Sequence, residues 1–323
     1  MVWFINALRA LAACLITNSH YTGIYPSNML ANGGLLGDII FFAVSGWCLY
    51  NVKTSFPRWY GKRLVRCYVP VLLITALYML LGYYSLRAHS AAWWYLFPTY
   101  YHFVASIIIL YIPFYIFMKI DWLRQRIPWL MLLIGVAYLL WYLLGYDRSY
   151  YHIDDVEEPA IRFLFMECML LGAWFRQRDE KVRNRFSWLT LAASFVLFAA
   201  YFASKILFSK LPGLAPFQIV NQVLIFALLY FILRLFAGLD GKLNRLPKWI
   251  KKSVELVAKI TLEIYVVQHY LIELLRDVAP FPLNWLCVTG AILLGAVILH
   301  CVSSWLLRGG EKLISKITKK KAV

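Results

Sequence analysis

The sequence is poor in charge and above all in acidic residues: only 15% of its 323 residues are charged, and 16 are Asp or Glu. The hydrophobic fraction is 62% and the mean hydropathy is +0.65, which is too apolar for a soluble domain of this length. Phe, Tyr and Trp make up 17% of the chain, and many stand at the ends of apolar runs, where their rings favour a membrane interface. Lipid is therefore the expected solvent of this protein.

The chain also lacks the spacings that mark metal and disulfide sites. Its six cysteines lie in or beside apolar runs with no CxxC pair, which is typical of small packing residues. The histidines show no metal-ligand spacing. No internal repeat, low-complexity tract or cleavable signal is evident. We therefore expect no metal, no disulfide and a single membrane-embedded domain over residues 1–323.

Ten apolar segments are long enough for a transmembrane helix, which needs roughly 17 to 25 mainly apolar residues. We place them near residues 3–19, 34–52, 68–84, 101–118, 128–146, 161–175, 187–204, 217–236, 258–275 and 284–306. The predicted fold class is all-α, a polytopic membrane helix bundle of about ten transmembrane helices.

Lys and Arg alternate in density from loop to loop. The second, fourth, sixth and eighth loops and the C-terminal tail hold 26 of the 33 Lys and Arg, whereas the opposite loops hold six. The positive-inside rule places the basic loops and both chain ends in the cytoplasm. A nucleic-acid binder needs its basic groups on one continuous exposed face. The net charge of +17 is therefore interpreted as a topology signal.

Two ionisable residues at the first predicted helix, Arg9 and His20, stand out because such groups are costly in a bilayer and usually functional or partnered. Eleven residues separate them, so both share one helix face, about 16 Å apart along the axis. Asn6 lies one turn before Arg9. In the simpler interpretation Arg9 reaches the inner interface and His20 ends the helix. Together they favour a polar tunnel, in which a histidine can take a proton from a hydroxyl.

Two carboxyl groups are further candidates for the catalytic site. Asp38 lies in the second predicted helix, where Gly46 permits close helix contact, and it could pair with His20 or Arg9 or merely stand at the outer interface. Glu167 lies near the middle of the sixth predicted helix, where a carboxyl group is expensive unless it is paired or protonated.

A basic segment precedes the third predicted helix and contains Lys62, Arg63 and Arg66. Arg63 and Arg66 stand three residues apart, on adjoining parts of one face if the segment is helical. This arrangement suits an anchor for phosphate or pyrophosphate. Anchoring of a cytoplasmic loop by the positive-inside rule alone is the more common explanation of such a segment.

The outer segment 150–158 carries four carboxyl groups. It could bind a sugar or a cation, but we expect a solvated acidic loop, because acidic residues are tolerated outside the membrane.

Four segments together resemble the acyltransferase 3 family of bacterial membrane O-acyltransferases, which modify surface polysaccharides and other extracytoplasmic acceptors. They are the N-x-x-R-(x)10-H arrangement from Asn6 to His20, FFAVSGW at 41–47, KRLVRCYVP at 62–70 and ITLEIYVVQH at 260–269. The last is similar to the family's late S-x-x-Y-L-x-H segment, with Gln268 in place of the histidine and His269 alongside. The resemblance spans most of the chain.

The resemblance implies that Arg9 and His20 are essential catalytic groups and that the basic segment with Lys62, Arg63 and Arg66 contacts acyl-CoA. Acyl-CoA, expected to be acetyl-CoA, would be a co-substrate, with no cofactor bound permanently. The acceptor would be a hydroxyl of an extracytoplasmic glycan or glycolipid, and the protein would lie in a bacterial cytoplasmic membrane.

We therefore expect a membrane O-acyltransferase in which the acceptor attacks the thioester directly, because no serine or cysteine sits in an evident nucleophile setting; a transient acyl-histidine stays open. A transporter or flippase for a glycolipid or small anion could use the same polar stripe. A non-catalytic partner in an envelope assembly complex is a third reading. The arginines suit an anionic acyl group such as succinyl as well as acetyl.

Overall fold

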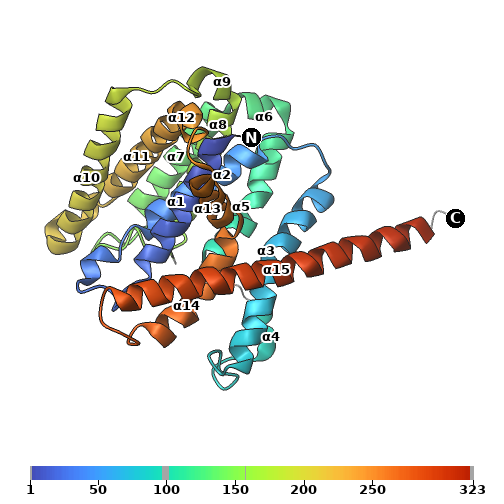
Figure 1. The fold of residues 1–323 in the computed structure, drawn as a ribbon. Coiled ribbons are helices and arrows are strands. Elements are labelled where there is room, and N and C mark those ends of the chain that lie inside the picture. Colours follow the sequence, from blue (N-terminus) through green and yellow to red (C-terminus); the bar gives the residue numbers. More distant parts are fainter. Residues whose placement is uncertain (1, 97–101, 157, 321–323) are drawn as a thin grey trace. The chain divides into compact units, whose positions relative to one another are not determined.

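The computed structural model describes residues 2–96, 102–156 and 158–320, and every regular element in these ranges is helical. Ten long helices follow one another along the chain (Figure 1): α1 (Trp3–Ser19), α2 (Gly34–Leu49), α3 (Phe56–Leu80), α5 (His102–Lys119), α7 (Ile127–Leu144), α8 (Ile161–Gln177), α10 (Trp188–Lys210), α11 (Ile219–Gly238), α14 (Thr261–Leu275) and α15 (Leu283–Lys320). Shorter helices stand between them: α4 (Ala91–Leu96), α6 (Asp121–Gln125), α9 (Asp179–Val182), α12 (Asp240–Leu243) and α13 (Lys248–Lys259). The all-α prediction is confirmed for the described residues.

Seven segments of the described chain are long and apolar enough to cross a membrane. They are Asn28–Leu49, Phe56–Leu80, His102–Lys119, Ile127–Leu144, Trp188–Lys210, Ile219–Gly238 and Leu283–Gly310. The helices α1, α8 and α14 are shorter, with 17, 17 and 15 residues. The protein is thus a multi-pass membrane protein, and each predicted span overlaps one long helix. Ten crossings and cytoplasmic ends stay predictions.

Helix α3 differs from the sequence expectation, which placed a basic loop before a span that starts near residue 68. The helix begins at Phe56, with a proline in its first turn, where the missing N–H group removes no helical hydrogen bond. It continues through Pro70. The basic segment is therefore helical, and Arg63 and Arg66 project from successive turns of α3.

The chain forms two compact units. The first comprises Met1–Ile16, Gly33–Thr54 and Ser106–Ala258, and the second comprises Thr17–Asn32, Ser55–Ala105 and Lys259–Val323. Because the boundary falls inside α1, the candidate residues divide between the units. The first unit holds Arg9, Asp38 and Glu167, and the second holds His20, Lys62, Arg63 and Arg66.

Direct backbone contact between α2 and α8 organises the first unit. A Cβ atom on Gly46 would lie 1.9 Å from the carbonyl oxygen of Met169, and one on Gly172 would lie 1.7 Å from that of Ala43. Only glycine, which lacks a Cβ atom, permits this approach. The close helix contact predicted at Gly46 is confirmed.

Helices α2 and α8 run in the same direction. The rings of Phe42 and Phe165 stack with their centroids 4.2 Å apart, and further along both helices the Arg176 guanidinium lies 4.4 Å from the ring centroid of Trp47. Both helices are even-numbered in the predicted series of crossings, which alternate in direction. Their parallel packing therefore agrees with the predicted order of spans.

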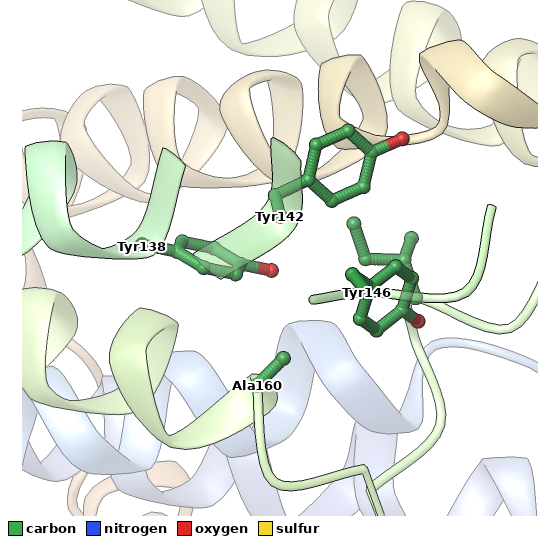
Figure 2. Packing of buried hydrophobic residues seen from close by; sticks show 5 residues of the cluster. Tyr138, Tyr142, Tyr146 and Ala160 are labelled. Atoms are coloured by element: carbon green, nitrogen blue, oxygen red, sulfur yellow. The ribbon is translucent and has the colours of Figure 1, made fainter. Parts of the chain in front are cut away.

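The segment between α7 and α8 packs against other parts of the first unit. Figure 2 shows Tyr138, Tyr142, Tyr146 and Ala160 gathered in one buried cluster. The Tyr142 hydroxyl donates to the carbonyl oxygen of Pro216 at 2.6 Å. Aromatic rings thus bury the apolar part of this segment, while one hydroxyl ties α7 to the turn before α11.

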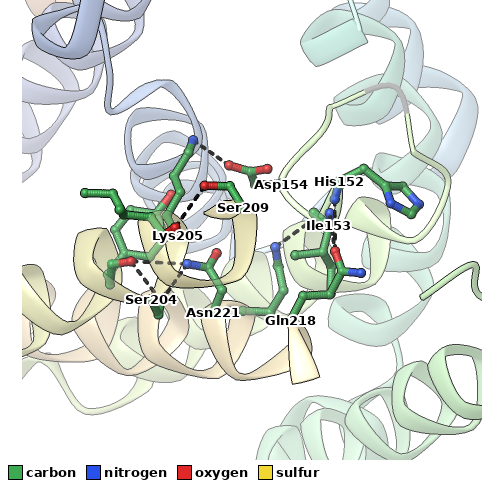
Figure 3. A network of polar contacts seen from close by, with 11 residues as sticks. His152, Ile153, Asp154, Ser204, Lys205, Ser209, Gln218 and Asn221 are labelled. Atoms are coloured by element: carbon green, nitrogen blue, oxygen red, sulfur yellow. Dashed lines mark hydrogen bonds and ion pairs between the residues drawn. The ribbon is translucent and has the colours of Figure 1, made fainter. Parts of the chain in front are cut away.

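Polar contacts also fasten this segment to α10 and α11 (Figure 3). Lys205 Nζ lies 2.5 Å from Asp154 Oδ2, and Gln218 Oε1 accepts hydrogen bonds from the backbone N–H groups of His152 and the next residue, at 2.9 and 3.0 Å. The Asp154 side chain is only 13% exposed. The expectation of a solvated loop is therefore wrong for Asp154, because a lysine of α10 compensates its charge; Glu157 lies outside the described residues.

In the second unit, α14 lies against α3 and α15. The buried Tyr78 hydroxyl of α3 donates a hydrogen bond that the carbonyl oxygens of Val266 and Val267 share, at 3.0 and 2.9 Å from the hydroxyl oxygen. A Cβ atom on Gly295 of α15 would lie 2.9 Å from the Val267 side chain. The middle of α14 is therefore held between two neighbouring helices.

Candidate functional site

The end of α1 brings His20 against a second histidine. The backbone N–H of His20 donates to the carbonyl oxygen of Thr17 at 3.1 Å, which closes the last turn of the helix. The imidazole rings of His20 and His269 meet edge to face, with centroids 4.6 Å apart and ring planes 70° apart. Both residues are half-buried. Two imidazoles at this distance offer both proton acceptors and donors to one ligand.

The segment after His20 is fastened to α15 of the same unit. The hydroxyls of Tyr21 and Thr289 share a hydrogen bond of 2.8 Å, and Asn284 Nδ2 donates to the carbonyl oxygen of Ile24 at 3.1 Å. These bonds join residues more than 250 positions apart, so they hold His20 in place through the tertiary structure.

His20 directly follows α1 and lies outside the seven candidate spans. Burial lowers the pKa of its imidazole from the usual value of 6.5, because the charged form loses hydration. The ring is therefore neutral at physiological pH, which is the form that a general base needs.

Gln268 occupies the position beside His269. Its side chain is completely buried, and neither its amide nitrogen nor its oxygen has a hydrogen-bond partner among the described residues. Buried polar atoms are normally paired, so this amide can donate to and accept from a ligand. Gln268 is therefore a further candidate binding group, one residue before His269 on α14 and about 100° around the helix from it.

The three basic residues of α3 have different surroundings. The Arg63 guanidinium lies 3.8 Å from the ring centroid of Trp59 and donates to the carbonyl oxygen of Trp59 at 2.7 Å. Lys62 and Arg66 are exposed. Arg66 stands twelve residues before Tyr78, which corresponds to about 18 Å along α3. Since Tyr78 contacts α14 next to Gln268, Arg66 lies about 18 Å and Arg63 about 22 Å along α3 from the level of the histidines.

Arg9, in the first unit, is half-buried, and its Nη2 donates to Cys48 Sγ at 3.4 Å. Cys48 and Asp38 are ten residues apart on α2, about 15 Å along the axis. The structure therefore does not bring Arg9 and Asp38 together, because the guanidinium faces the other end of that helix.

The two predicted carboxyl groups are both buried in the first unit. Asp38 lies four residues before Phe42 on α2, and Glu167 lies two residues after Phe165 on α8. No hydrogen bond or ion pair joins the two carboxyl groups among the described residues. They do not form a pair. Glu167 Oε1 has no hydrogen-bond partner among the described residues.

A polar chain in the second unit was not predicted from the sequence. His300 Nδ1 lies 2.7 Å from Glu263 Oε1, and Ser304 Oγ lies 3.3 Å from His300 Nε2. Serine, imidazole and carboxylate follow one another in the order of a nucleophile, a base and the group that orients the base. Ser304 therefore has a setting next to a histidine that the sequence did not reveal.

The sequence contained part of the signal for this chain. Glu263 and His300 are ionisable residues inside predicted spans, which is the criterion that singled out Arg9 and Glu167. Their pairing joins α14 to α15 across 37 residues, and the helix spacing within either segment does not reveal it.

One comparison with known proteins identifies the family of this chain. A family model described as an acyltransferase domain matches residues 2–303 of the 323. A search of curated proteins and a search of solved structures found no match. The matched range contains the motif residues of α1 and α3, the histidine pair and nearly all of the helices. We conclude that the chain belongs to the acyltransferase 3 family of membrane acyltransferases.

Proposed function

We propose that this protein transfers an acetyl group from cytoplasmic acetyl-CoA to a hydroxyl of an extracytoplasmic glycan or glycolipid. The observation that supports this most directly is the histidine pair at the end of α1, with centroids 4.6 Å apart and His20 held neutral by burial. A neutral imidazole near the end of a membrane helix can take a proton from an acceptor that arrives from that side. The bacterial cytoplasmic membrane is the proposed location.

The proposed reaction is a direct transfer. His20 removes the proton from the acceptor hydroxyl, and the oxygen attacks the thioester carbonyl carbon. The carbon–sulfur bond then breaks, the ester forms, and the coenzyme A thiolate takes up the proton that His20 holds. His269 and the Gln268 amide orient the acceptor or hydrogen-bond to the developing oxyanion. Atoms and charges balance, with the free thiol as the second product.

The basic residues would hold the donor. Arg63 and Arg66, with Lys62, would bind the phosphates of the coenzyme, because guanidinium groups form paired, charge-assisted hydrogen bonds with phosphate oxygens. From there the thioester arm would have to extend about 18 Å along α3 to reach the level of the histidines. From its place in the family motif, we assign Arg9 to the stabilisation of negative charge on the donor.

The test is transfer of a labelled acetyl group from acetyl-CoA in isolated membranes. His20→Ala should lower transfer by about 100-fold or more, the usual contribution of a general base, while protein amount and membrane insertion stay normal. His89→Ala is the matched control, since His89 is an exposed histidine of the same unit that stacks on Trp93. Full transfer by His20→Ala would refute the assignment of the base.

The same membranes separate an enzyme from a transporter. Movement of a glycolipid or small anion by the unaltered protein, without any acylated product, would favour the transporter or flippase. Mass spectrometry of surface glycans from cells with and without this chain identifies the acyl group. Glycans that carry an added acetyl mass only in cells with this chain support the proposal. An added succinyl mass would show that succinyl-CoA, and not acetyl-CoA, is the donor.

A further inference from the structure

A basic pocket opens on the first unit, and none of the residues that line it is assigned to the reaction. It encloses about 250 Å³ between the C-terminal part of α8, the α9 turn and the end of α11. Its lining includes four cationic side chains, Arg178, Lys181, Arg185 and Arg234, and the aromatic side chains of Trp174 and Tyr230. No carboxyl group is among the residues that line this pocket.

None of the four cations of this pocket forms an ion pair with a carboxylate among the described residues. The Asp179 carboxylate, next to the pocket, accepts two hydrogen bonds from the Arg183 guanidinium. Its Oδ2 also lies 3.6 Å from Arg176 Nη1. Neither of these arginines lines the pocket. Arg178 Nη1 is buried and has no hydrogen-bond partner among the described residues. Four like charges held together raise the free energy of the empty pocket, and a bound anion would relieve this repulsion.

The backbone holds these cations in place. Asn184 adopts a left-handed conformation (φ 62°), its N–H donates to the carbonyl oxygen of Ala237 at 2.9 Å, and its Oδ1 accepts from Gly241 N–H at 2.7 Å. A Cβ atom on Gly238 would lie 2.9 Å from the Arg185 carbonyl oxygen. The turn is thus fixed against the end of α11, which brings Arg185 toward the α11 side of the pocket before any ligand binds.

The aromatic residues hold two of the cations in set positions. The Arg178 guanidinium lies 4.2 Å from the Trp174 ring centroid, and Arg234 Nη1 donates to the Tyr230 hydroxyl at 3.1 Å. Guanidinium groups held in this way keep free N–H donors for a planar or tetrahedral oxyanion. The volume is below the roughly 300 to 1,000 Å³ of pockets that enclose a whole drug-sized ligand. A compact anionic head group therefore fits, with the rest of its molecule outside.

We infer that this pocket binds the phosphate group of a phosphate ester that carries at least two negative charges. Two sources have this chemistry: the phosphates of a nucleotide such as coenzyme A, and the head group of an anionic phospholipid. Both would approach from the side that the predicted topology assigns to the cytoplasm. The inference does not depend on His20 or on Arg63 and Arg66.

The experiment measures binding to the full-length protein in neutral detergent with three probes: inorganic pyrophosphate, coenzyme A and cardiolipin. Lys181→Gln/Arg185→Gln removes two exposed cations of the pocket, so the fold is retained. Arg124→Gln/Arg126→Gln is the control, since it removes the same charge from the same unit outside the pocket. We expect at least one probe to bind about tenfold or more weakly to the pocket variant only.

The three probes separate the sources. Weaker binding of pyrophosphate and coenzyme A by the pocket variant alone supports a nucleotide phosphate, and the coenzyme A binding that remains is that of Arg63 and Arg66. Loss of cardiolipin binding alone supports a lipid head group. If the pocket variant and the control bind every probe as the unaltered protein does, the inference is refuted. Thermal unfolding of both variants confirms that weaker binding does not reflect misfolding, and His20→Ala should keep binding at the pocket.

Discussion

The His20 imidazole differs from a surface histidine because it packs against His269 at the end of α1. Burial lowers its pKa from 6.5, so protonation requires a lower pH than for an exposed histidine. A general base must be neutral to accept a proton. Transfer activity is therefore lost only as the pH falls through the pKa of His20 and the ring becomes protonated. We therefore predict that kcat/KM for transfer stays constant from pH 8 to about 6.5 and declines below it.

This prediction is checked by a pH profile of transfer with labelled acetyl-CoA in membranes. His269→Ala should let water reach His20, which restores hydration of the charged ring and moves the acid limb to higher pH. A decline that already starts well above pH 6.5 in the unaltered protein would show that His20 is not the neutral base.

The pair of Glu263 and His300 is an electrostatic contact between α14 and α15, with a side-chain exposure of only 8% for Glu263. His300→Ala leaves this carboxyl group buried without its partner, which should lower the free energy of unfolding by about 2 kcal/mol. Thermal unfolding in detergent measures the loss. Glu263→Gln with His300→Ala should recover part of it, since the unpaired carboxyl group is gone.

Ser304 tests whether the same polar chain takes part in the chemistry. Under direct transfer, Ser304→Ala should keep normal acyl transfer. Ser303→Ala is the matched control, since Ser303 neighbours it and donates to the His300 carbonyl oxygen at 3.2 Å. Loss of transfer in Ser304→Ala alone, with unchanged stability, would overturn the direct mechanism and identify Ser304 as a nucleophile.

At the scale of the elements, the contact of α2 with α8 depends on glycines that leave no room for a side chain. Gly46→Ala places a Cβ atom 1.9 Å from the Met169 carbonyl oxygen, so the helices must move apart. We predict a loss of about 1–3 kcal/mol in the free energy of unfolding, the usual cost of overpacking. Gly290→Ala on α15 is the control, because no atom lies within 4 Å of its added carbon. Equal melting temperatures for both variants would contradict this packing argument.

Helix α3 shows why a boundary was missed. Its first turns carry Lys62, Arg63 and Arg66, and hydropathy alone assigns such residues to a loop. The helix nevertheless starts at Phe56, since its internal hydrogen bonds form whether the side chains face water or lipid. Hydropathy detects the part of a helix that lies in lipid. It does not detect polar turns of the same helix that extend out of the lipid.

At the scale of the whole molecule, the uneven distribution of Lys and Arg predicts that the basic loops and both ends face the cytoplasm. Fusion proteins test this directly. Alkaline phosphatase, active only outside the cytoplasm, should be active when fused after Arg148, and green fluorescent protein fused after Val323 should fluoresce. The reverse pattern would invert the topology, and it would also place the basic pocket on the outer side.

The sequence by itself determined the fold class, the resemblance to the family, and the motif residues around Arg9, His20 and Arg63. Apolar runs of membrane length, the spacing from Arg9 to His20 and the basic segment around Arg63 are local patterns, and helix periodicity is enough to interpret them.

Only the tertiary structure decided which polar groups meet. It paired His20 with His269, Glu263 with His300, and Asp154 with Lys205, and it gathered Arg178 and Arg234 around one pocket. These partners lie on different helices, and their contacts depend on helix rotation and register. Rotation and register are set by packing of many side chains at once, including glycine contacts such as that of Gly46, so no local pattern encodes them.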